Sequence, residues 1–510
     1  MKRITSLKIE KLFGTFDYEI DFEKTDGFTI LTAPNGFGKS TVLKIIRAAA
    51  VGNFCYFAGL VFDRIEMKFK GTMGDEWRPR MGPGSEPLSD EEAARPKETI
   101  LFIEKTARVV EESEEEASSS ENSDEETFQP YVCRICCDDF ENFFTDEDID
   151  RSVSEVVGSV QTLEPMYQYM SNGSCRLWKD KKDGEVFDMS GVFRRYSLHF
   201  RRIFPWLVTL VRRLNFEVNY ISTNRLYNEE IERSVSGFAG RVRGRQIEEG
   251  QDLGLNPHLL KIFSISDDIR AAHNRCMRAQ LQIARNLESN FVDRVVETLN
   301  QKNRPSAEET RKKISSKMTS IARLEKSCNE FGIITSANKK KSKNPETDDD
   351  SALIVFSMYL DDVKAKMDVF EPLIKKLKIF SESLKELLDL KTVTINLSDW
   401  ESILGIKNSR SGAAIPLDAL SSGEQHLIVL LGRLLFDANN SEALVMMDEP
   451  EISFHPSWQE EFSEILFKIQ NESRDAKNAR PKRQFIVATH SPAFIGDHWD
   501  KTVELAKMVK

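Results

Sequence analysis

The segment that constrains the fold most is Ala33 to Ser40, a loop with two glycines between an apolar run and a helical pattern. Phe28 to Leu31 has the composition of a short buried strand, and Ser40 to Ala50 has the spacing of a helix. Gly36 and Gly38 allow the backbone amides to turn toward a polyphosphate, and the positive end of the helix would face the same anion. The sequence therefore predicts an α/β fold class built around a phosphate-binding loop.

This loop matches the P-loop pattern of nucleotide-binding proteins, except that Ala33 stands where the pattern begins with Gly. Lys39 is expected to reach the β- and γ-phosphates of ATP, and Ser40 to be a ligand of Mg²⁺. The residues expected to bind the cofactor ATP in this loop are Asn35, Gly36, Phe37, Gly38, Lys39, Ser40 and Thr41. The alternative is an accidental match, which the position between a strand and a helix disfavours.

A second apolar strand, Leu444 to Met447, ends in two carboxylates, as a Walker B segment requires. Asp448 would hold Mg²⁺, directly or through water, and Glu449 would polarise the attacking water. The alternative interpretation is a solvated strand end with two acidic residues.

Two further motifs follow the same order as in a known superfamily. Leu420 to Gln425 precedes an apolar helical pattern and resembles the signature motif of ABC-type ATPases. Phe485 to Pro492 is an apolar strand that ends in His490, which matches the family's switch histidine. With the P-loop and the Walker B strand, these motifs make the chain similar to the ABC-type ATPase heads of the RecF, SMC and OLD-like AAA group.

The resemblance implies a role for each motif. In that family the signature binds the γ-phosphate held by the opposite subunit, so hydrolysis depends on dimerisation. The matching residues expected to bind nucleotide are Ser421, Ser422, Gly423 and Glu424. Glu449 and His490 are the expected catalytic residues. The alternative for Ser421 is a helix N-cap with a neighbouring acid.

Two other loops are expected from the resemblance. Glu451 to Pro456 occupies the D-loop, in a form closer to OLD and RecF-like proteins than to transporter subunits, and His455 would contact either a partner subunit or its own helix start. The segment most similar to the Q-loop is Val218 to Arg225. Asn224 would there replace the family's Gln, so the expected metal ligands are Ser40, Asp448 and Asn224.

The order of patterns predicts a head split by a helical, coiled-coil-like hairpin. Residues 1–262 would form the first lobe, with an acidic insertion near 107–130, residues 263–391 the hairpin, and residues 392–510 the second lobe. Apolar residues at helical spacing from Ile314 to Cys328 and from Phe356 to Leu387 predict two long helices joined by an exposed tip at Asn338 to Asp350, the second kinked at Pro372. The alternative is a set of ordinary helices packed on the head.

Composition bounds the cellular context. The net charge of −11 is concentrated in the acidic run from Glu111 to Glu126, so it leaves nucleic-acid binding open at basic clusters elsewhere. Those clusters are Arg194-Arg195, Arg201-Arg202, Arg212-Arg213, Arg241, Arg243 and Arg245. Seven irregularly spaced cysteines fit a reducing compartment, with Cys133 and Cys136 as either a thiol pair or half of a zinc site. No secretory signal or long apolar run is present, so we expect a cytoplasmic protein with no membrane contact.

The function expected from the resemblance is that of a sensor ATPase. Little sequence follows His490, and OLD nucleases carry a Toprim domain there, so chemistry beyond ATP hydrolysis would come from a partner. The chain resembles the ATPase subunits of two-gene antiphage systems such as Septu and PARIS. This implies a homodimer or higher homo-oligomer through ATP-bridged heads, a separately encoded nuclease effector, and DNA or a phage protein as trigger. The alternatives are a RecF-like repair ATPase that clamps duplex DNA and an assembly scaffold with little turnover.

Overall fold

The computed structural model describes most of the predicted head and helical segments. The described residues are 3–51, 55–58, 60–71, 97–107, 131–137, 167–172, 175–180, 186–188, 218–221, 257–300, 306–334, 349–399, 402–436, 444–472, 474–475, 478–481 and 483–508. The chain forms two compact units, of which unit 1 comprises 1–223, 441–452 and 459–510, and unit 2 comprises 224–440 and 453–458. These units place the signature motif with the helical segments, whereas the sequence-based division at 262 and 391 remains a prediction.

The first sheet of unit 1 is antiparallel. Its strands, in spatial order, are β2 (Phe16–Asp21), β1 (Arg3–Leu12), β4 (Arg64–Gly71), β5 (Lys97–Ala107) and β6 (Tyr131–Cys137). β1 alternates, with Leu7 and Ile9 fully buried, so one face of the strand packs into the core. The turn between β1 and β2 contains Gly14 at a φ of 76°, a backbone conformation that glycine accepts readily.

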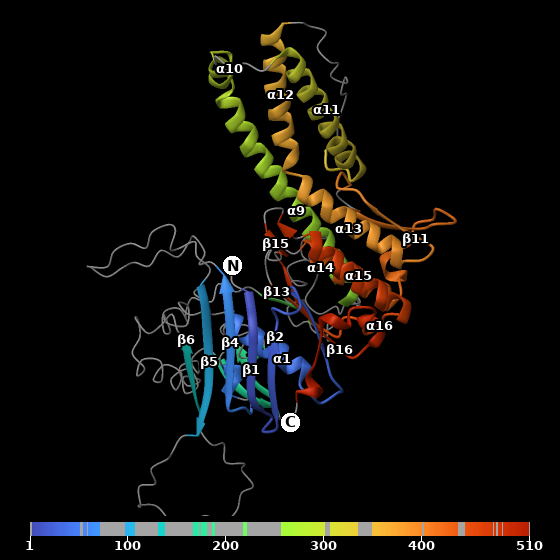
Figure 1. Cartoon of the computed structure of the whole chain (residues 1–510). Helices are drawn as coiled ribbons and strands as arrows, with labels where there is room; N and C mark the ends of the chain where they lie inside the picture. The colour runs from blue at the N-terminus through green and yellow to red at the C-terminus, as the bar shows by residue number, and fades with distance from the viewer. Residues whose placement is uncertain are drawn as a thin grey trace, which may run out of the picture. The chain divides into compact units, whose positions relative to one another are not determined.

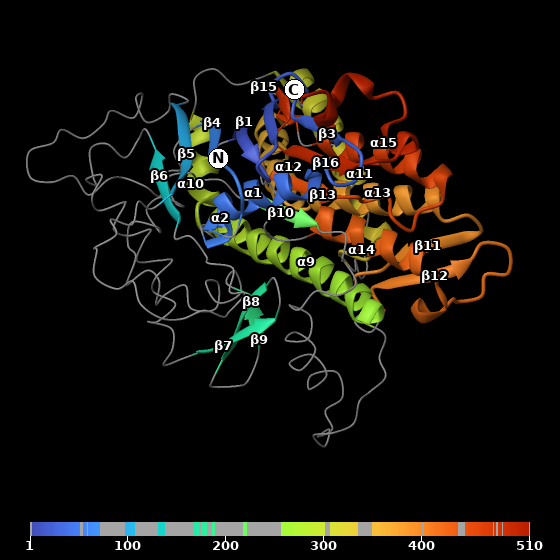
Figure 2. The ribbon, with the colours of Figure 1, turned by 90° about the horizontal axis from the view of Figure 1, so that it is seen from below.

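The second sheet of unit 1 carries the nucleotide motifs. Its parallel strands, in spatial order, are β10 (Val218–Ile221), β13 (Leu444–Asp448), β16 (Gln484–Thr489), β3 (Phe28–Thr32) and β17 (Thr502–Glu504). Asp448 lies opposite Ala488, and Thr489 lies opposite Thr32. The carboxyl ends of β13, β16 and β3 therefore meet at one edge, where ligands bind in open α/β sheets; Figure 2 shows these strands side by side.

The remaining elements of unit 1 are helices and two smaller, separate sheets, one of three strands and one of two. They are α1 (Lys39–Val51), α2 (Cys55–Ala58), β7 (Tyr167–Asn172), β8 (Cys175–Asp180), β9 (Val186–Asp188), β14 (Arg474–Asp475), β15 (Asn478–Pro481), α16 (Pro492–Ile495), η4 (Trp499–Lys501) and η5 (Leu505–Lys507). α15 (Pro456–Glu472) belongs to unit 1 apart from its first three residues. The core of the unit contains Val42 and Ile46 of α1 packed with Met446 and Ile486 of the parallel sheet.

Unit 2 is mainly helical. Its elements are α9 (Pro257–Ser289), α10 (Phe291–Asn300), α11 (Ala307–Glu330), α12 (Asp350–Asp368), α13 (Glu371–Leu387), β11 (Lys391–Ile395), β12 (Leu404–Asn408), η3 (Leu417–Ala419) and α14 (Ser422–Phe436). Figure 1 shows α9, α11 and α12 running side by side beyond α13 and α14. None of the helices that the structure describes combines the length and the apolar composition of a membrane span.

The long helices form an insertion as predicted, but their directions differ from a simple two-helix hairpin. The Lys317 ammonium of α11 donates to the Ser357 hydroxyl of α12 at 2.8 Å, and Ser327 further along α11 accepts from Lys378 of α13 at 3.0 Å. Contacts therefore advance in the same order on both segments, so α11 and α12 run in the same direction. Apart from Asp349 and Asp350, the expected tip at 338–350 lies outside the described residues.

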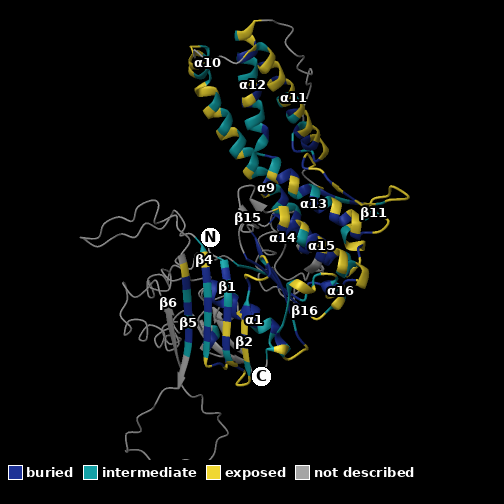
Figure 3. Cartoon of the chain, in the orientation of Figure 1, coloured by how far each residue is buried: buried dark blue, intermediate teal, exposed yellow. Residues whose placement is uncertain are grey.

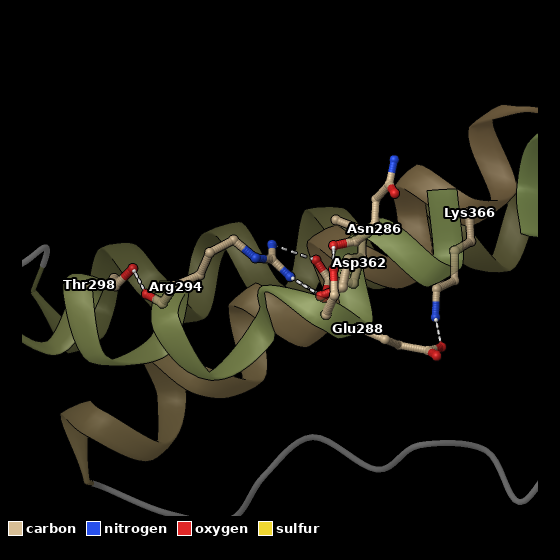
Figure 4. A network of polar contacts seen from close by, with 8 residues as sticks. Asn286, Glu288, Arg294, Thr298, Asp362 and Lys366 are labelled. Carbon is tan, nitrogen blue, oxygen red and sulfur yellow. Dashed lines mark hydrogen bonds and ion pairs between the residues drawn. The ribbon is translucent and has the colours of Figure 1, made fainter. Parts of the chain in front are cut away.

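α9 and α10 run against α12. The Lys366 ammonium lies 3.1 Å from the Glu288 carboxylate, and Arg294 donates to both oxygens of Asp362 at 2.9 and 2.7 Å. Figure 4 shows this paired arrangement of contacts along the two helices. The antiparallel pair is therefore formed by α9 and α10, which run in one direction, and α11, which runs back. α11 and α12, which the predicted tip joins, run in the same direction.

The prediction of a single helix from Phe356 to Leu387 was wrong. α12 ends at Asp368, and α13 starts at Glu371 with Pro372 in its first turn. Proline cannot donate the backbone hydrogen bond that a continuous helix needs, but it is well accommodated in a first turn. Pro372 therefore starts a new helix instead of bending one.

We predict that Phe380→Ala destabilises unit 2 by about 3–5 kcal/mol. The Phe380 ring is fully buried and meets Phe436 of α14 edge to face, with centroids 5.4 Å apart. Figure 3 shows α13 and α14 as largely buried and the outer ends of the long helices as largely exposed. Urea unfolding measures the loss, and Tyr359→Ala at a half-exposed site of α12 is the control. Equal midpoints for the two variants would contradict the assignment of Phe380 to the core.

Candidate nucleotide-binding site

The P-loop between β3 and α1 has a backbone that only glycine accepts readily at two positions. Gly36 and Gly38 have φ values of 92° and 75°. A Cβ atom at Gly38 would also lie 3.2 Å from the Phe13 ring and 3.3 Å from the Leu12 side chain. The loop is thus shaped by its glycines and by the turn after β1.

Lys39 is directed into this loop. Its side chain is buried, and its ammonium donates to the carbonyl oxygens of Ala33 at 2.7 Å and Pro34 at 3.5 Å. Phosphate oxygens make stronger, charge-assisted acceptors for an ammonium group than neutral carbonyls do. The position of Lys39 therefore suits a polyphosphate held by the loop.

An aromatic cluster supports the loop from the first sheet. The Tyr18 hydroxyl donates to the Phe37 carbonyl at 2.6 Å, and the Phe16 ring lies 5.4 Å from the Phe37 ring. Burial raises the pKa of Tyr18 to about 12, so this hydroxyl remains a donor at neutral pH. Sequence reasoning missed Tyr18 and Phe16, whose proximity to the loop follows from tertiary contacts.

The P-loop and Walker B strand meet directly. The Ser40 hydroxyl donates to Asp448 Oδ1 at 2.9 Å, across 408 residues of sequence. The Tyr220 hydroxyl lies 3.5 Å from Asp448 Oδ2, and the Arg47 guanidinium lies over the Tyr220 ring at 5.1 Å. Burial, together with the Asp448 charge, raises the pKa of Tyr220. Sequence reasoning missed Tyr220 and chose Asn224 instead, which lies outside the described residues.

The donor set at this point fits Mg²⁺. A hydroxyl oxygen from Ser40 and a buried carboxylate from Asp448 are hard oxygen ligands, which this ion prefers. Within the described residues, no group of three or more His, Cys, Asp or Glu side chains forms a separate metal cluster. A nucleotide phosphate would have to complete the ligand set, as in other P-loop proteins.

The predicted catalytic pair is brought together at the same sheet edge. The His490 imidazole nitrogen Nδ1 lies 3.1 Å from Glu449 Oε1. Glu449 has a φ of 47°, an uncommon value for a side-chain-bearing residue, and its backbone amide donates to the Ala488 carbonyl at 2.8 Å. The Glu449 carboxylate thus follows a strained turn and contacts His490, whose side chain is half-exposed.

A second glutamate lies behind this pair. Glu451 is buried, and one of its oxygens accepts a hydrogen bond from the Thr489 hydroxyl. Burial raises the pKa of the Glu451 carboxyl, and the nearby Glu449 charge acts in the same direction, whereas Thr489 and His490 oppose it. Sequence reasoning placed Glu451 in the D-loop without giving it a role.

We predict that Glu451→Gln raises the thermal midpoint above that of the parent at about pH 8 and that the gap closes toward about pH 4. The folded-state pKa of Glu451 is raised above its ordinary value of 4.5, so folding favours the protonated acid. Native stability is therefore lost as pH rises from that value through the raised pKa, and the uncharged amide escapes this loss. Other acids titrate equally in both proteins, so melts at several pH values isolate Glu451. A gap that is independent of pH would contradict the assignment.

The signature motif opens α14 in unit 2. The Ser421 hydroxyl accepts from the Glu424 amide at 3.4 Å, and the Glu424 carboxylate accepts from the Ser421 amide at 2.9 Å. This reciprocal pair is a capping box, so the N-cap interpretation of Ser421 is confirmed. The Lys391 ammonium also binds the Glu424 carboxylate. Burial opposes ionisation of Glu424, but the hydrogen bonds from Lys391 and Ser421 together lower its pKa.

The rest of the signature is shaped by the D-loop. A Cβ atom at Gly423 would lie 2.8 Å from the Ser453 carbonyl oxygen, so only glycine fits there without a shift. Ser421 and Ser422 are exposed. His455 is also exposed, and its Nδ1 lies 2.9 Å from the Ser457 hydroxyl, a contact at the start of α15. The structure thus supplies the helix-start contact for His455.

Comparisons with known proteins show similarity over parts of the chain. Residues 247–495 match the family described as AAA ATPase domain, and the P-loop precedes the matched region. A segment of 133 residues is 32% identical to the Retron Vc95 probable ATPase of Vibrio cholerae serotype O1 biovar El Tor, and it spans 24% of this chain and 23% of that protein.

Solved structures of SMC heads align along most of the chain at low similarity. The Smc head domain with an extended coiled coil bound to the C-terminal domain of ScpA from Pyrococcus furiosus is 12% identical, with 97% of this chain and 91% of that chain covered and a TM-score of 0.33. The SMC head domain from Thermotoga maritima is 8% identical, with the same coverage and a TM-score of 0.29. Residues 247–495 are thus similar to AAA ATPase domains, and the chain carries, in order, four motifs that resemble those of ABC-type ATPases.

Proposed function

We propose that this chain binds ATP with Mg²⁺ and hydrolyses it. The observation that carries the proposal is the contact of Ser40 with Asp448 at the sheet edge where Glu449 meets His490. The residues proposed as phosphate cradle, metal ligands and carboxylate base follow the carboxyl ends of adjacent strands of one sheet, which supports the proposal.

The chain's own residues divide the chemistry. The P-loop amides and Lys39 would hold the β- and γ-phosphates, and Ser40 and Asp448 would hold Mg²⁺, which neutralises phosphate charge when bound. Glu449 would accept a proton from the attacking water. His490 would orient the Glu449 carboxylate and donate toward the γ-phosphate from its exposed position.

We further propose that the signature motif of a second subunit completes the nucleotide-binding site. Ser421 and Ser422 are exposed at the start of α14, where backbone amides and the helix dipole favour an anion. The homo-oligomer would then depend on bound ATP.

The biological role that we propose is a sensor subunit of an antiphage defence complex that controls a separately encoded nuclease. The supporting observations are the partial match to a retron ATPase and the resemblance of the motifs to ATPases of two-gene systems. Phage challenge of cells that carry the chain with its neighbouring genes tests this role. Protection that disappears with Lys39→Ala and with loss of the effector gene is the expected result, and protection by the chain alone would contradict it.

We predict that the purified chain with ATP and Mg²⁺ or Mn²⁺ does not cleave DNA or RNA. Metal-dependent nucleases need several carboxylates that converge on metal ions, and Asp448 and Glu449 are assigned to the nucleotide-binding site. Gel assays with plasmid, linear DNA and RNA measure the outcome. Cleavage lost in an Asp448→Ala variant would contradict the assignment, whereas cleavage retained in that variant would indicate a contaminant or a separate nuclease site in this chain. ATP turnover in the same samples tests the alternatives, because strong stimulation by duplex DNA favours repair and negligible turnover favours a scaffold.

A further inference from the structure

Glu451 is a buried acid that the proposed hydrolysis does not use. It follows the Walker B acids by two residues and is 3% exposed. Its Oε1 atom accepts the Thr489 hydroxyl, and its Oε2 atom is buried without a hydrogen-bond partner. Burying a carboxyl group with only part of its hydrogen bonding satisfied is unfavourable, so an apolar side chain would be the more stable choice at this position.

The partner of Glu451 controls the backbone next to His490. Thr489 is the last residue of β16 and is fully buried. Its hydroxyl oxygen accepts from the Ser491 amide at 3.0 Å, so it bonds on both sides at once. Ser491 in turn donates to Gln459 of α15 at 2.5 Å and caps α16.

His490 is therefore held through its neighbours. The residues before and after it are anchored by hydrogen bonds, whereas its own ring is half-exposed and contacts Glu449 at 3.1 Å. Glu451 is also close to Glu449 along the chain. The two residues lie in the same turn, where the Ile452 amide donates to the Glu449 carbonyl at 3.3 Å. One buried contact thus joins the turn that carries Glu449 to the strand end that carries His490.

We propose that Glu451 is a positioning residue for hydrolysis, and that its contact with Thr489 holds the His490 imidazole against the Glu449 carboxylate. The inference rests on the proposed ATP hydrolysis and deepens it. Glu451 does not touch the water or the phosphates in this role. Its effect passes through Thr489 and the backbone on either side of His490.

Two pairs of variants separate this role from plain structural support. Glu451→Ala and Thr489→Val each remove the contact, whereas Glu451→Gln and Thr489→Ser each keep an acceptor or a hydroxyl at the same place. We expect kcat to fall about 10-fold or more in the first pair, with the Kd for ATP within about threefold of the parent. The second pair should keep kcat within about threefold.

A double-mutant cycle gives the sharper measurement. If Glu451 acts through Thr489, the Glu451→Ala/Thr489→Val variant has the same kcat as the Thr489→Val variant, because Thr489→Val already removes the contact with Glu451. Ser463→Ala is the matched control, since this buried hydroxyl of α15 donates within its own helix to the Glu460 carbonyl. Its kcat should equal that of the parent.

The outcomes are decisive for the inference. A Thr489→Val variant with parental kcat, or multiplied losses in the double variant, would overturn it. If Glu451→Ala does not fold, the comparison of Thr489→Val with Thr489→Ser still decides, because both keep Glu451. A parent chain without turnover would remove the proposed ATPase function itself, whereas an active parent with unaffected variants would remove only the role of Glu451.

Discussion

Glu449→Gln is expected to lower kcat for ATP hydrolysis by about 100-fold or more while ATP and Mg²⁺ still bind. The amide keeps the size of the side chain and its contact with His490, which lies 3.1 Å from Glu449 Oε1, but it cannot accept a proton from water. Lys39, Ser40 and Asp448 are untouched, so the phosphate cradle and metal ligands stay in place. The nucleotide-bound oligomer should therefore accumulate, which light scattering or size-exclusion chromatography with ATP detects.

A second His–Glu pair in unit 1 supplies the matched control. His498 lies 2.7 Å from Glu464 at an exposed position. Glu464→Gln makes the same chemical change away from the predicted site, so it should leave turnover at the parental level. Turnover of Glu449→Gln within about threefold of the parent would remove Glu449 from the role of general base.

Mixing two inactive variants is expected to restore activity. Lys39→Ala removes the P-loop ammonium, and Ser421→Arg places a large cation at the exposed start of α14, so each protein alone should lose turnover. In a composite site between two subunits, a mixed dimer contains one pair of intact motifs. An equal mixture of the two variants should therefore recover about a quarter of parental activity if subunits exchange freely and each intact site works independently.

Controls distinguish the interface from damage to the helix. Ser421→Arg also removes a capping interaction, which contributes about 1 kcal/mol, so its melting curve must remain cooperative. Ser411→Arg introduces the same cation at another exposed serine of unit 2 and should keep full turnover. ATP binding to Ser421→Arg should match the parent. A mixture that stays inactive although both variants fold and bind each other would contradict the two-subunit site.

The local motifs could be predicted from the sequence because each depends on short-range chemistry. A loop that turns its amides toward phosphate favours glycine, which Gly36 and Gly38 supply. The short, uniformly apolar runs before Ala33, Asp448 and His490 are typical of buried strands. The structure confirms the strand, loop and helix at 28–51. The assigned roles of the site residues remain predictions.

The helical insertion was only partly predictable. Periodic apolar residues located α11, α12 and α13, but the pattern is the same whether two helices run in parallel or antiparallel. The break before Pro372 was also ambiguous, since proline in a helical pattern is compatible with a kink and with a new first turn. Contacts between distant residues, such as Lys317 with Ser357, decided the direction of the helices.

The sequence by itself determined which functional side chains are available to the site. Tertiary structure decided which of them lie in contact. Tyr220, Thr489 and Glu451 lie in segments that resemble family motifs, but sequence reasoning assigned no role to any of the three, and Glu451 is one acid among 82 acidic residues. Their importance follows from burial and from contacts across long stretches of chain, Tyr220 with Asp448 and Thr489 with Glu451. Hydrogen bonding and desolvation act over a few ångströms in space, so a residue's partner is set by strand order and register, which local sequence patterns do not encode.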